Sequence, residues 1–367
     1  MRKMYFVSSW NEEKEKTWSG INWGLFCSLK KYFDLCDINI GHIKKPLYLK
    51  VWHKLLLLGG NDFGYYVINK CKKYMDKKLQ DGIYFQFSSI VKDRNGISTY
   101  EFLDCSTNSV LNMYNNDPEM FKHCNFSTAN YKYIKKRAED EFEYFKTCAG
   151  VFTLCHWLVD DLINNIGLPA EKVHYAGSGI NVDYEKIDES KKTGNKILFV
   201  GKDFERKGGY LVIEAFKELK KKYSEAELYV AGPKKNPISE DIDGYHFLGL
   251  CNREQLNDLY NKCDVFAMPS YFEAFGIVFA EALCFGLPCL GRRCCDMPMI
   301  IDEGKTGEIV DNDDAKAASE KLYNMLVDKK YRETVHSKRD YYLSEYSWDK
   351  VAERIYNVIS NDQHSTK

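Results

Sequence analysis

The sequence lacks an excess of either charge. It contains 52 lysine and arginine residues against 53 aspartate and glutamate residues, which gives a formal net charge of −1 at pH 7. Because there is no global positive field, the composition does not indicate binding to nucleic acid. A local basic patch is still compatible with this balance.

The sequence also lacks any C-x-x-C pair, although it has 13 cysteines spread from Cys27 to Cys295. An odd number at scattered spacings argues against a disulfide framework and against a zinc ribbon or finger. We expect reduced, mostly buried thiols in a cytosolic protein. A redox-active pair at the adjacent Cys294 and Cys295 is the weaker interpretation.

Long hydrophobic runs are missing as well. The start, "MRKMYFVSSW", has a basic head but no apolar stretch of signal-peptide length. The most apolar region, "PLYLKVWHKLLLLGG", is interrupted by Lys50, His53 and Lys54, whereas a spanning helix needs about 20 apolar residues. The sequence therefore predicts a cytoplasmic location, with peripheral contact on the inner face of a membrane as the alternative.

What the sequence does have is strand–helix alternation over a length that favours two domains. In the second half, "KILFVG" reads as a strand and "GGYLVIEAFKELKKKY" as an amphipathic helix. The alternation continues through "AELYVAG", "REQLNDLYNKC", "DVFAMPS" and "FGIVFAEALCFG". Such alternation is typical of parallel sheets wound on both faces.

The first half alternates less regularly. Its candidate strands are Met4–Ser9, Asp37–Ile40, Gly82–Ser88, Tyr100–Leu103, Val151–Leu154 and Lys172–Ala176. Its candidate helices are Asn22–Tyr32, Tyr65–Leu79, Tyr131–Lys146 and His156–Ile166. The polar stretch "NVDYEKIDESKKTGN" is the expected linker. We predict an N-terminal domain over 1–184, a C-terminal domain over 185–346, and a final helix within 347–367 that packs back on the first domain.

The stretch "FVGKDFERKGG" is a candidate anion site. It brings Lys202, Arg206 and Lys207 into a loop between a strand and the glycines that open a helix. Cationic side chains beside the free N–H groups of a helix start are suited to phosphate. A solvated basic loop is the alternative. The spacing differs from the P-loop pattern.

The stretch "EAFGIVFAE" begins with Glu273 and ends with Glu281. A helix that starts near Gly276 would present the backbone N–H groups of Phe275, Gly276 and Ile277 to a ligand. Glu281 follows in an apolar helix, and a buried carboxylate needs a hydrogen-bonding partner. We expect a bound ligand to supply it, for example two neighbouring sugar hydroxyls.

The run P-S-x-x-E-A-F-G-x-x-x-x-E-A-L-x-x-G-x-P, from Pro269 to Pro288, resembles the E-x7-E motif of family 4 glycosyltransferases. "FVGKDFERKGG" resembles the diphosphate-binding loop of that family, "WSGINWGL" its N-terminal loop, and "TGEIVD" the turn after the motif. The resemblance is strong over roughly 172–311. It implies an α/β fold of the GT-B type, with two Rossmann-like doubly wound parallel-sheet domains facing across a cleft.

The resemblance also implies roles for single residues. Lys202, Arg206 and Lys207 would bind the diphosphate of a nucleotide-sugar, and Glu281 its ribose. Many family members have arginine at the position of Lys202. Gly20 would let the N-terminal loop approach the phosphates.

A second set of implied roles concerns the transferred sugar. Glu273, with the amides at Phe275, Gly276 and Ile277, would position it. Asp104 stands where many members have a catalytic histidine, and it is the candidate catalytic group of the first domain. A helix cap is the alternative for Asp104. The resemblance implies no metal and no other cofactor.

Three further patterns carry less information. "DID" at Asp241–Asp243 and "GSG" at Gly177–Gly179 are interpreted as turns. "YYVINKCKKYMDKKL" places Lys70, Lys73 and Lys77 on one helical face. Together with "SLKKYF" and "IKKPLYLKVWHK", it predicts either a solvated surface or a basic-aromatic patch for anionic lipid or a lipid-linked acceptor.

The predicted function is transfer of a sugar from a UDP- or GDP-linked donor to a hydroxyl of a glycan or lipid-linked acceptor, with retention of anomeric configuration. A sugar-nucleotide epimerase on the same fold is one alternative. A non-catalytic nucleotide-sugar-binding protein is another.

Overall fold

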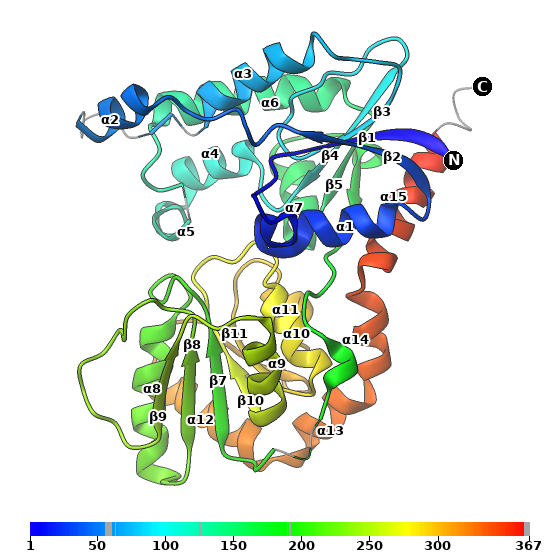
Figure 1. Ribbon diagram of the computed structural model, residues 1–367. Coiled ribbons are helices and arrows are strands. Elements are labelled where there is room, and N and C mark those ends of the chain that lie inside the picture. Colours follow the sequence, from blue (N-terminus) through cyan, green and yellow to red (C-terminus); the bar gives the residue numbers. More distant parts are fainter. Residues whose placement is uncertain (56–60, 63, 125, 189, 191, 363–367) are drawn as a thin grey trace. The chain divides into compact units, whose positions relative to one another are not determined.

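The computed structural model of the protein describes residues 1–55, 61–62, 64–124, 126–188, 190 and 192–362. The chain divides into two compact units, shown in Figure 1. The first comprises the described residues of Met1–Gly179 and of Trp348–Lys367, and the second is Ile180–Ser347. Each unit is built around its own parallel sheet, and the two are described separately.

The sheet of the first unit has six parallel strands in the order β2-β1-β3-β4-β5-β6. They are β1 (Arg2–Ser8), β2 (Phe33–Asn39), β3 (Gly82–Gln86), β4 (Ile97–Leu103), β5 (Gly150–Thr153) and β6 (Val173–Tyr175). The order reverses between β1 and β3, because β2 lies on the other side of β1. This switch point leaves a crevice at the carboxyl ends of the strands, where α/β proteins bind ligands.

Helices cover both faces of this sheet. They are α1 (Ile21–Leu29), α2 (Leu47–Leu55), α3 (Tyr65–Met75), α4 (Thr107–Asn116), α5 (Pro118–His123), α6 (Tyr131–Thr147) and α7 (His156–Asp160). Side chains of β1 alternate between the two faces. Phe6 packs edge-on against Phe26 of α1, with ring centroids 5.2 Å apart. Tyr5 and Val7 face the opposite way, so the sheet is doubly wound as predicted.

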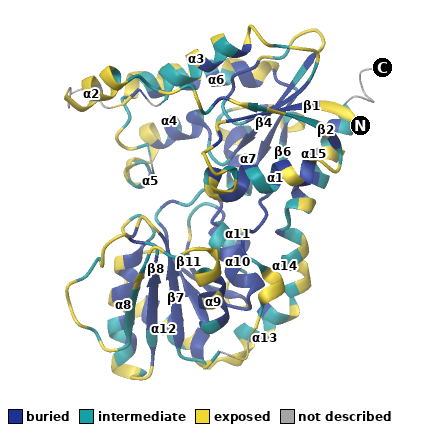
Figure 2. Cartoon of the chain, in the orientation of Figure 1, coloured by how far each residue is buried: buried dark blue, intermediate teal, exposed yellow. Residues whose placement is uncertain are grey.

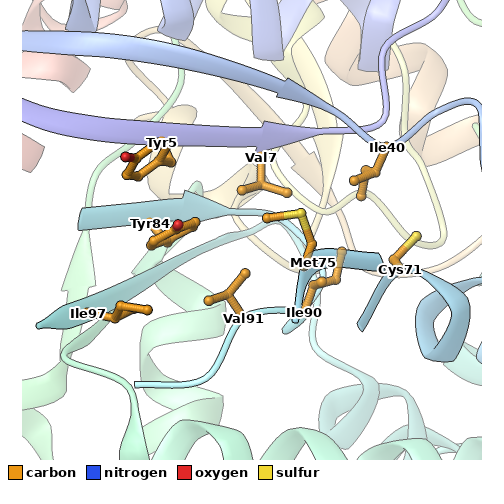
Figure 3. Packing of buried hydrophobic residues seen from close by; sticks show 9 residues of the cluster. All are labelled: Tyr5, Val7, Ile40, Cys71, Met75, Tyr84, Ile90, Val91 and Ile97. Carbon is orange, nitrogen blue, oxygen red and sulfur yellow. The ribbon is translucent and has the colours of Figure 1, made fainter. Parts of the chain in front are cut away.

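Figure 3 shows the core on the face that α3 covers. Cys71 and Met75 of α3 are buried against strand residues including Tyr5, Val7 and Tyr84. The opposite side of α3 exposes Lys70 and Lys73, and Lys77 is exposed in the turn just after the helix. The lysine face predicted from the sequence is therefore present, and it faces solvent.

The chain returns to the first unit through α15 (Trp348–Asp362). Asp349 accepts hydrogen bonds from Ser28 of α1 and from Lys31. Tyr356 stacks on Tyr32 at a centroid distance of 4.8 Å. The last helix of the chain thus completes the face of the sheet on which α1 lies.

The sheet of the second unit has six parallel strands in the order β12-β11-β10-β7-β8-β9. They are β7 (Lys196–Val200), β8 (Glu227–Ala231), β9 (Tyr245–Gly249), β10 (Val265–Ala267), β11 (Cys289–Arg292) and β12 (Gly307–Val310). Read from β9 this is the 3-2-1-4-5-6 order of dinucleotide-binding sheets, with its switch point between β7 and β10. Every residue of β7, β10 and β11 is buried, as Figure 2 shows, which is typical of parallel strands covered on both faces.

The helices of the second unit are α8 (Gly209–Lys222), α9 (Arg253–Lys262), α10 (Ile277–Cys284), α11 (Met297–Ile300), α12 (Ala315–Val327), α13 (Lys329–Ser337) and α14 (Arg339–Glu345). In Figure 1, α8 and α12 lie on one side of the sheet and α9 and α10 on the other. A reciprocal cap between Asn252 and Gln255 fixes the start of α9.

The structure differs from the sequence-based element assignment in several places. Helices α2, α4, α5 and α11 to α14 were not predicted, and "TGEIVD" contains strand β12 rather than only a turn. Helix α4 is rich in Asn, which is a weak helix former. It forms because the Ser106 side chain caps it by accepting a hydrogen bond from the amide of Ser109.

The most apolar stretch of the sequence is described only in part. Residues 56–60 lie outside the described residues. Among the residues that the structure describes, no helix has both the length and the apolar content needed to cross a membrane.

Candidate functional site

Two cations and a carboxylate meet at the switch point of the second sheet. Arg206 and Lys207 lie in the loop after β7, and Glu273 lies in the loop after β10. Lys207 Nζ donates to Glu273 Oε2 at 2.9 Å, and Arg206 Nη1 lies 3.5 Å from the same oxygen. All three side chains are largely buried, with 14%, 14% and 17% of their side-chain surface exposed.

Local packing holds both cations in place. A Cβ atom at Gly201 would lie 2.3 Å from Cδ of Lys207, so only glycine lets the lysine stem lie against the end of β7. The Arg206 guanidinium also donates to Asp203 at 3.1 Å and to the carbonyl oxygen of Phe272. The two loops are joined further by the amide of Tyr271, which donates to the carbonyl of Arg206 at 2.9 Å.

The charge state of Glu273 follows from this arrangement. Burial opposes its ionisation, but the charges of Lys207 and then Arg206 outweigh burial and lower the pKa of Glu273 below its ordinary value. Glu273 is therefore an anion held between two cations. Lys207 can donate three hydrogen bonds, and here its partners are Glu273 and the sulfur of Met268.

The helix start after Glu273 is shaped by a glycine. Gly276 has φ +84° and is the N-cap of α10. A Cβ atom at this position would lie 2.8 Å from Phe279 and 3.2 Å from Cγ of Glu273. Within the described residues, no side chain caps α10. The first backbone N–H groups of α10 therefore have no partner within the helix, and they lie close to Glu273 in the sequence. Phe275 and Gly276 are buried and Ile277 is partly exposed.

Glu281 lies in α10 and is 5% exposed. Its carboxylate accepts hydrogen bonds from the Tyr260 hydroxyl at 3.1 Å and from the Asn181 amide at 3.3 Å. The protein thus supplies two partners for this carboxylate, from α9 and from the segment before β7, and the binding of a ligand by Glu281 stays a prediction. Burial raises the pKa of Glu281 to about 7 despite these hydrogen bonds.

Lys202 does not join this cluster. It is exposed, and within the described chain it makes no ion pair, whereas Arg206 and Lys207 both contact Glu273. The structure thus brings together Arg206, Lys207, Glu273 and Gly276. At the start of α8, Gly208 has φ +72°, and no side chain of the described residues caps the helix. Together with this helix start, the cluster can hold an anionic group.

The first unit has a cavity of about 430 Å³ at its own switch point. Val7 and Ser9 at the end of β1, Phe87 after β3 and Asp104 after β4 all line it. Asp104 does not cap α4, because Ser106 does. The helix-cap alternative for Asp104 is therefore wrong, and its catalytic role stays a prediction.

The N-terminal loop forms another wall of this cavity. Thr17, Trp18 and Asn22 line it, and Gly20, with φ +91°, is the N-cap of α1 between them. Trp18 packs edge-on against Phe87, with centroids 5.7 Å apart. Asn22 is 4% exposed and donates through Nδ2 to Ser8, while its Oδ1 atom has no hydrogen-bond partner among the described residues.

The ionisable side chains that line this cavity are mainly carboxyl groups. Glu101, which is fully buried, accepts two hydrogen bonds from the Ser89 amide at 2.8 and 3.0 Å. Burial raises its pKa well above the ordinary range, and burial also raises the pKa of Glu141 against the opposing charge of Arg137. Arg137 is the cation among the described residues that line the cavity.

Several of these residues were not identified from the sequence. Glu101 interrupts the apolar strand "TYEFL", and a charged residue in such a strand is a usable signal of a buried polar site. Glu141 and Arg137 lie in a helix rich in charged residues, where nothing in the sequence marks them. Tyr260 carries no local signal either, because its partner Glu281 is 21 residues further along the chain.

Comparison with protein families gives a match over the second unit. Residues 183–340 match the model of the family described as "Glycosyl transferases group 1". The chain is similar to the D-inositol 3-phosphate glycosyltransferase of Corynebacterium kroppenstedtii, with 29% identity over 45% of this chain and 40% of the relative. The chain spans between 30% and 63% of the length of the curated relatives that it matches.

Solved structures resemble the chain over nearly its full length. Sucrose-phosphate synthase from Thermosynechococcus elongatus aligns with a TM-score of 0.65 at 13% identity, covering 100% of both chains. The Anabaena protein HepE, solved in complex with UDP and glucose, aligns with a TM-score of 0.63 at 13% identity, covering 98% of this chain and 100% of its own. At these identities the likeness concerns the fold, and it confirms the GT-B type with two Rossmann-like domains.

Proposed function

We propose that the chain is a group 1 glycosyltransferase, the family whose model residues 183–340 match, and that it transfers a sugar from a nucleotide-sugar to a hydroxyl of a glycan or lipid-linked acceptor. The anomeric configuration of the sugar is retained in the product. The observation that carries the proposal is the Arg206–Lys207–Glu273 cluster at the switch point of the second sheet.

The donor diphosphate binds at this cluster. Arg206 can contact two phosphate oxygens at once and Lys207 provides a point charge. The uncapped start of α8 adds backbone N–H donors beside them. As the bond between sugar and diphosphate breaks, these groups stabilise the charge that develops on the leaving nucleoside diphosphate. We therefore expect a metal-independent reaction, in which activity persists in the presence of EDTA.

The two glutamates act on different parts of the donor. Glu273, an anion beside the start of α10, positions the transferred sugar through its hydroxyls. Glu281 binds the ribose, and its protein partners Tyr260 and Asn181 orient the carboxylate. Because HepE, which shares this fold, was solved with UDP and glucose, a UDP-linked hexose is the first donor to test.

The acceptor hydroxyl binds in the cavity of the first unit. Trp18 and Phe87 offer aromatic surfaces for a sugar ring, and Asn22 Oδ1 offers an acceptor for a hydroxyl. Asp104, at the end of β4, is the candidate group for handling the hydroxyl proton. We propose that the protein works in the cytoplasm and uses the nucleotide-sugars there as its substrates.

The test combines binding with product analysis. A panel of UDP- and GDP-sugars is screened by thermal shift, because a donor that binds the folded state raises its apparent stability. The donor that binds is then incubated with glycan and lipid-linked acceptors, and the anomeric configuration of the product is read by NMR. Glu281→Ala is expected to weaken nucleotide binding, whereas Glu273→Ala is expected chiefly to slow transfer.

Three outcomes would contradict the proposal. Conversion of the nucleotide-sugar without any acceptor would indicate an epimerase. Donor binding without transfer to any acceptor would indicate a non-catalytic binding protein. Normal binding and turnover in both glutamate variants would overturn the site assignment.

A further inference from the structure

Helix α2 presents large apolar side chains to solvent. Leu47 is 75% exposed, Leu55 76% and Trp52 53%, and Tyr48 and Val51 are also exposed. At about 100° per residue, these five positions fall within an arc of roughly 140° on one side of the helix. Figure 2 shows α2 as a largely exposed element of the first unit. The orientation of α2 is therefore the reverse of that of an ordinary surface helix, whose apolar side faces the protein core.

A groove continues this apolar face toward α3. It has a volume of about 310 Å³ and is lined by Leu49, Trp52, Asp62, Tyr65, Tyr66, Asn69, Lys70, Lys73 and Tyr133. Aromatic side chains dominate its walls, and the two lysines of α3 are exposed at its edge. Contiguous apolar surface of this kind marks a contact site rather than ordinary solvent-exposed structure.

The charges around the apolar face are of one sign. Lys44, Lys50, Lys54, Lys70 and Lys73 are all exposed. Helices α2 and α3 contain no aspartate or glutamate. The nearby Asp62 is buried and paired with Lys45, so its charge is already balanced. The surface therefore combines an apolar centre with a positive border.

We propose that this face, α2 with the Lys70 and Lys73 edge of α3, docks on the surface of a membrane that contains anionic lipids. The helix has nine residues, or about 14 Å at 1.5 Å per residue, which fits a helix lying in the interface and not one crossing it. Trp52 and Tyr48 suit the headgroup level, and the lysines complement anionic headgroups. A protein partner would instead need acidic side chains that match the lysine border.

This inference goes beyond sugar transfer and does not depend on it. Docking uses only residues of the first unit that are remote in sequence from the Arg206–Lys207–Glu273 cluster. Membrane binding is therefore measured without donor or acceptor, and a failed transfer assay leaves it unaffected. If both hold, the enzyme acts on an acceptor presented at the membrane surface.

The experiment is co-sedimentation with vesicles of phosphatidylcholine alone or of equal parts phosphatidylcholine and phosphatidylglycerol. The wild-type chain is expected to sediment with the anionic vesicles and to release as ionic strength rises, because salt screens the lysines. The triple variant Leu47→Ser, Val51→Ser, Leu55→Ser is expected to lose at least about tenfold in partitioning, since each exposed apolar side chain contributes through buried area. Lys70→Glu with Lys73→Glu is expected to give a similar loss on anionic vesicles.

The matched control is Met299→Ser with Tyr341→Ser. These side chains of the second unit are 65% and 59% exposed, and the control should bind vesicles as the wild type does. Because all substituted residues are exposed, unchanged thermal unfolding will show that each variant folds. Equal binding to both vesicle types, or unchanged binding by the triple variant, would overturn the proposal. So would a wild-type chain that ignores vesicles but self-associates through α2.

Discussion

The two units carry crevices at the same position of the same kind of sheet, yet the ionisable groups around the two crevices differ. In the second unit, Arg206 and Lys207 both contact the carboxylate of Glu273, and Arg206 also pairs with the more exposed Asp203. In the first unit, Glu101, Glu141 and Asp104 line a cavity in which Arg137 is the cation among the described residues. The shared fold places both crevices at a switch point, and the side chains that surround each switch point, from loops in the second unit and mainly from β4 and α6 in the first, decide which groups the crevice attracts.

The pKa shifts of the buried glutamates also differ between the two units. Two cations lower the pKa of Glu273, although burial opposes them. Burial dominates at Glu101 and Glu141 and raises the pKa of both. A diphosphate is therefore compatible with the second crevice, whereas an uncharged hydroxyl group is the better match for the first.

The largest effect is expected from removing a cation of the second crevice. Lys207→Met keeps the length of the side chain but removes the charge beside Glu273. If the cluster stabilises the leaving diphosphate, transfer should fall by about 10²- to 10³-fold, the usual loss when one group that stabilises developing charge is removed. The measurement is kcat and KM with the donor identified by thermal shift. Lys207→Arg, which keeps the charge, should retain more activity than Lys207→Met.

A second prediction separates Glu281 from Glu273 by the pH dependence of stability. The folded pKa of Glu281 is about 7, against an ordinary value of 4.5, so between these pH values the folded state binds more protons than the unfolded state. The contribution of Glu281 to the free energy of unfolding is fully present below about pH 4.5. It is lost as the pH rises to about 7, and the total loss is about 3 kcal/mol. Urea unfolding of wild type and Glu281→Gln across this range should show the loss in the wild type only.

Glu273 should behave in the opposite way. Its folded pKa is lowered, so its stabilising contribution is present above its ordinary pKa and is lost as pH falls. A Glu273→Gln variant should therefore be less stable than the wild type at neutral pH, with the difference shrinking in acid. The same pH trend in both variants would mean that the two glutamates do not differ as described.

A third, smaller effect is expected in the first unit. Arg137→Met leaves Glu101 and Glu141 buried without their cation. Because Arg137 is itself partly exposed, we expect a loss of about 2 kcal/mol, below the range for breaking a fully buried pair. Urea unfolding measures it, and Lys135→Met, at an exposed position of the same helix, is the control. An equal effect of both substitutions would remove the basis for the electrostatic contrast.

The contrast also shows what could be read from the sequence. Strand–helix alternation predicted both doubly wound sheets. The loop after β7 and the E-x7-E run identified Arg206, Lys207 and Glu273 as candidate site residues, although neither motif shows that the three side chains are in contact. These features are local, because hydrophobic periodicity, loop position and residue type can each be recognised within a short stretch of sequence. Some missed elements have weak local signals, such as the asparagine-rich α4, whereas helices α12 to α14 were missed without that reason.

The rest depends on contacts between distant segments. Tyr260 and Asn181 converge on Glu281 from positions 21 and 100 residues away, and no spacing rule connects them. The direction of α2 could not be predicted either, because an apolar stripe is expected to face inward. Only the packed first unit shows that Leu47 and Leu55 face solvent.

The smallest effect is expected for Lys202. It lies in the same loop as Arg206 and Lys207 but is exposed, and within the described residues it has no ion-pair partner. A solvent-exposed charge that is not held in place contributes little, on the order of 0.5 kcal/mol or less. Lys202→Ala should therefore change donor affinity by less than about threefold, measured by calorimetry beside Lys207→Met. A loss as large as that of Lys207→Met would show that the loop closes on the donor and recruits Lys202, and the second crevice would then owe its charge to three cations and not to two.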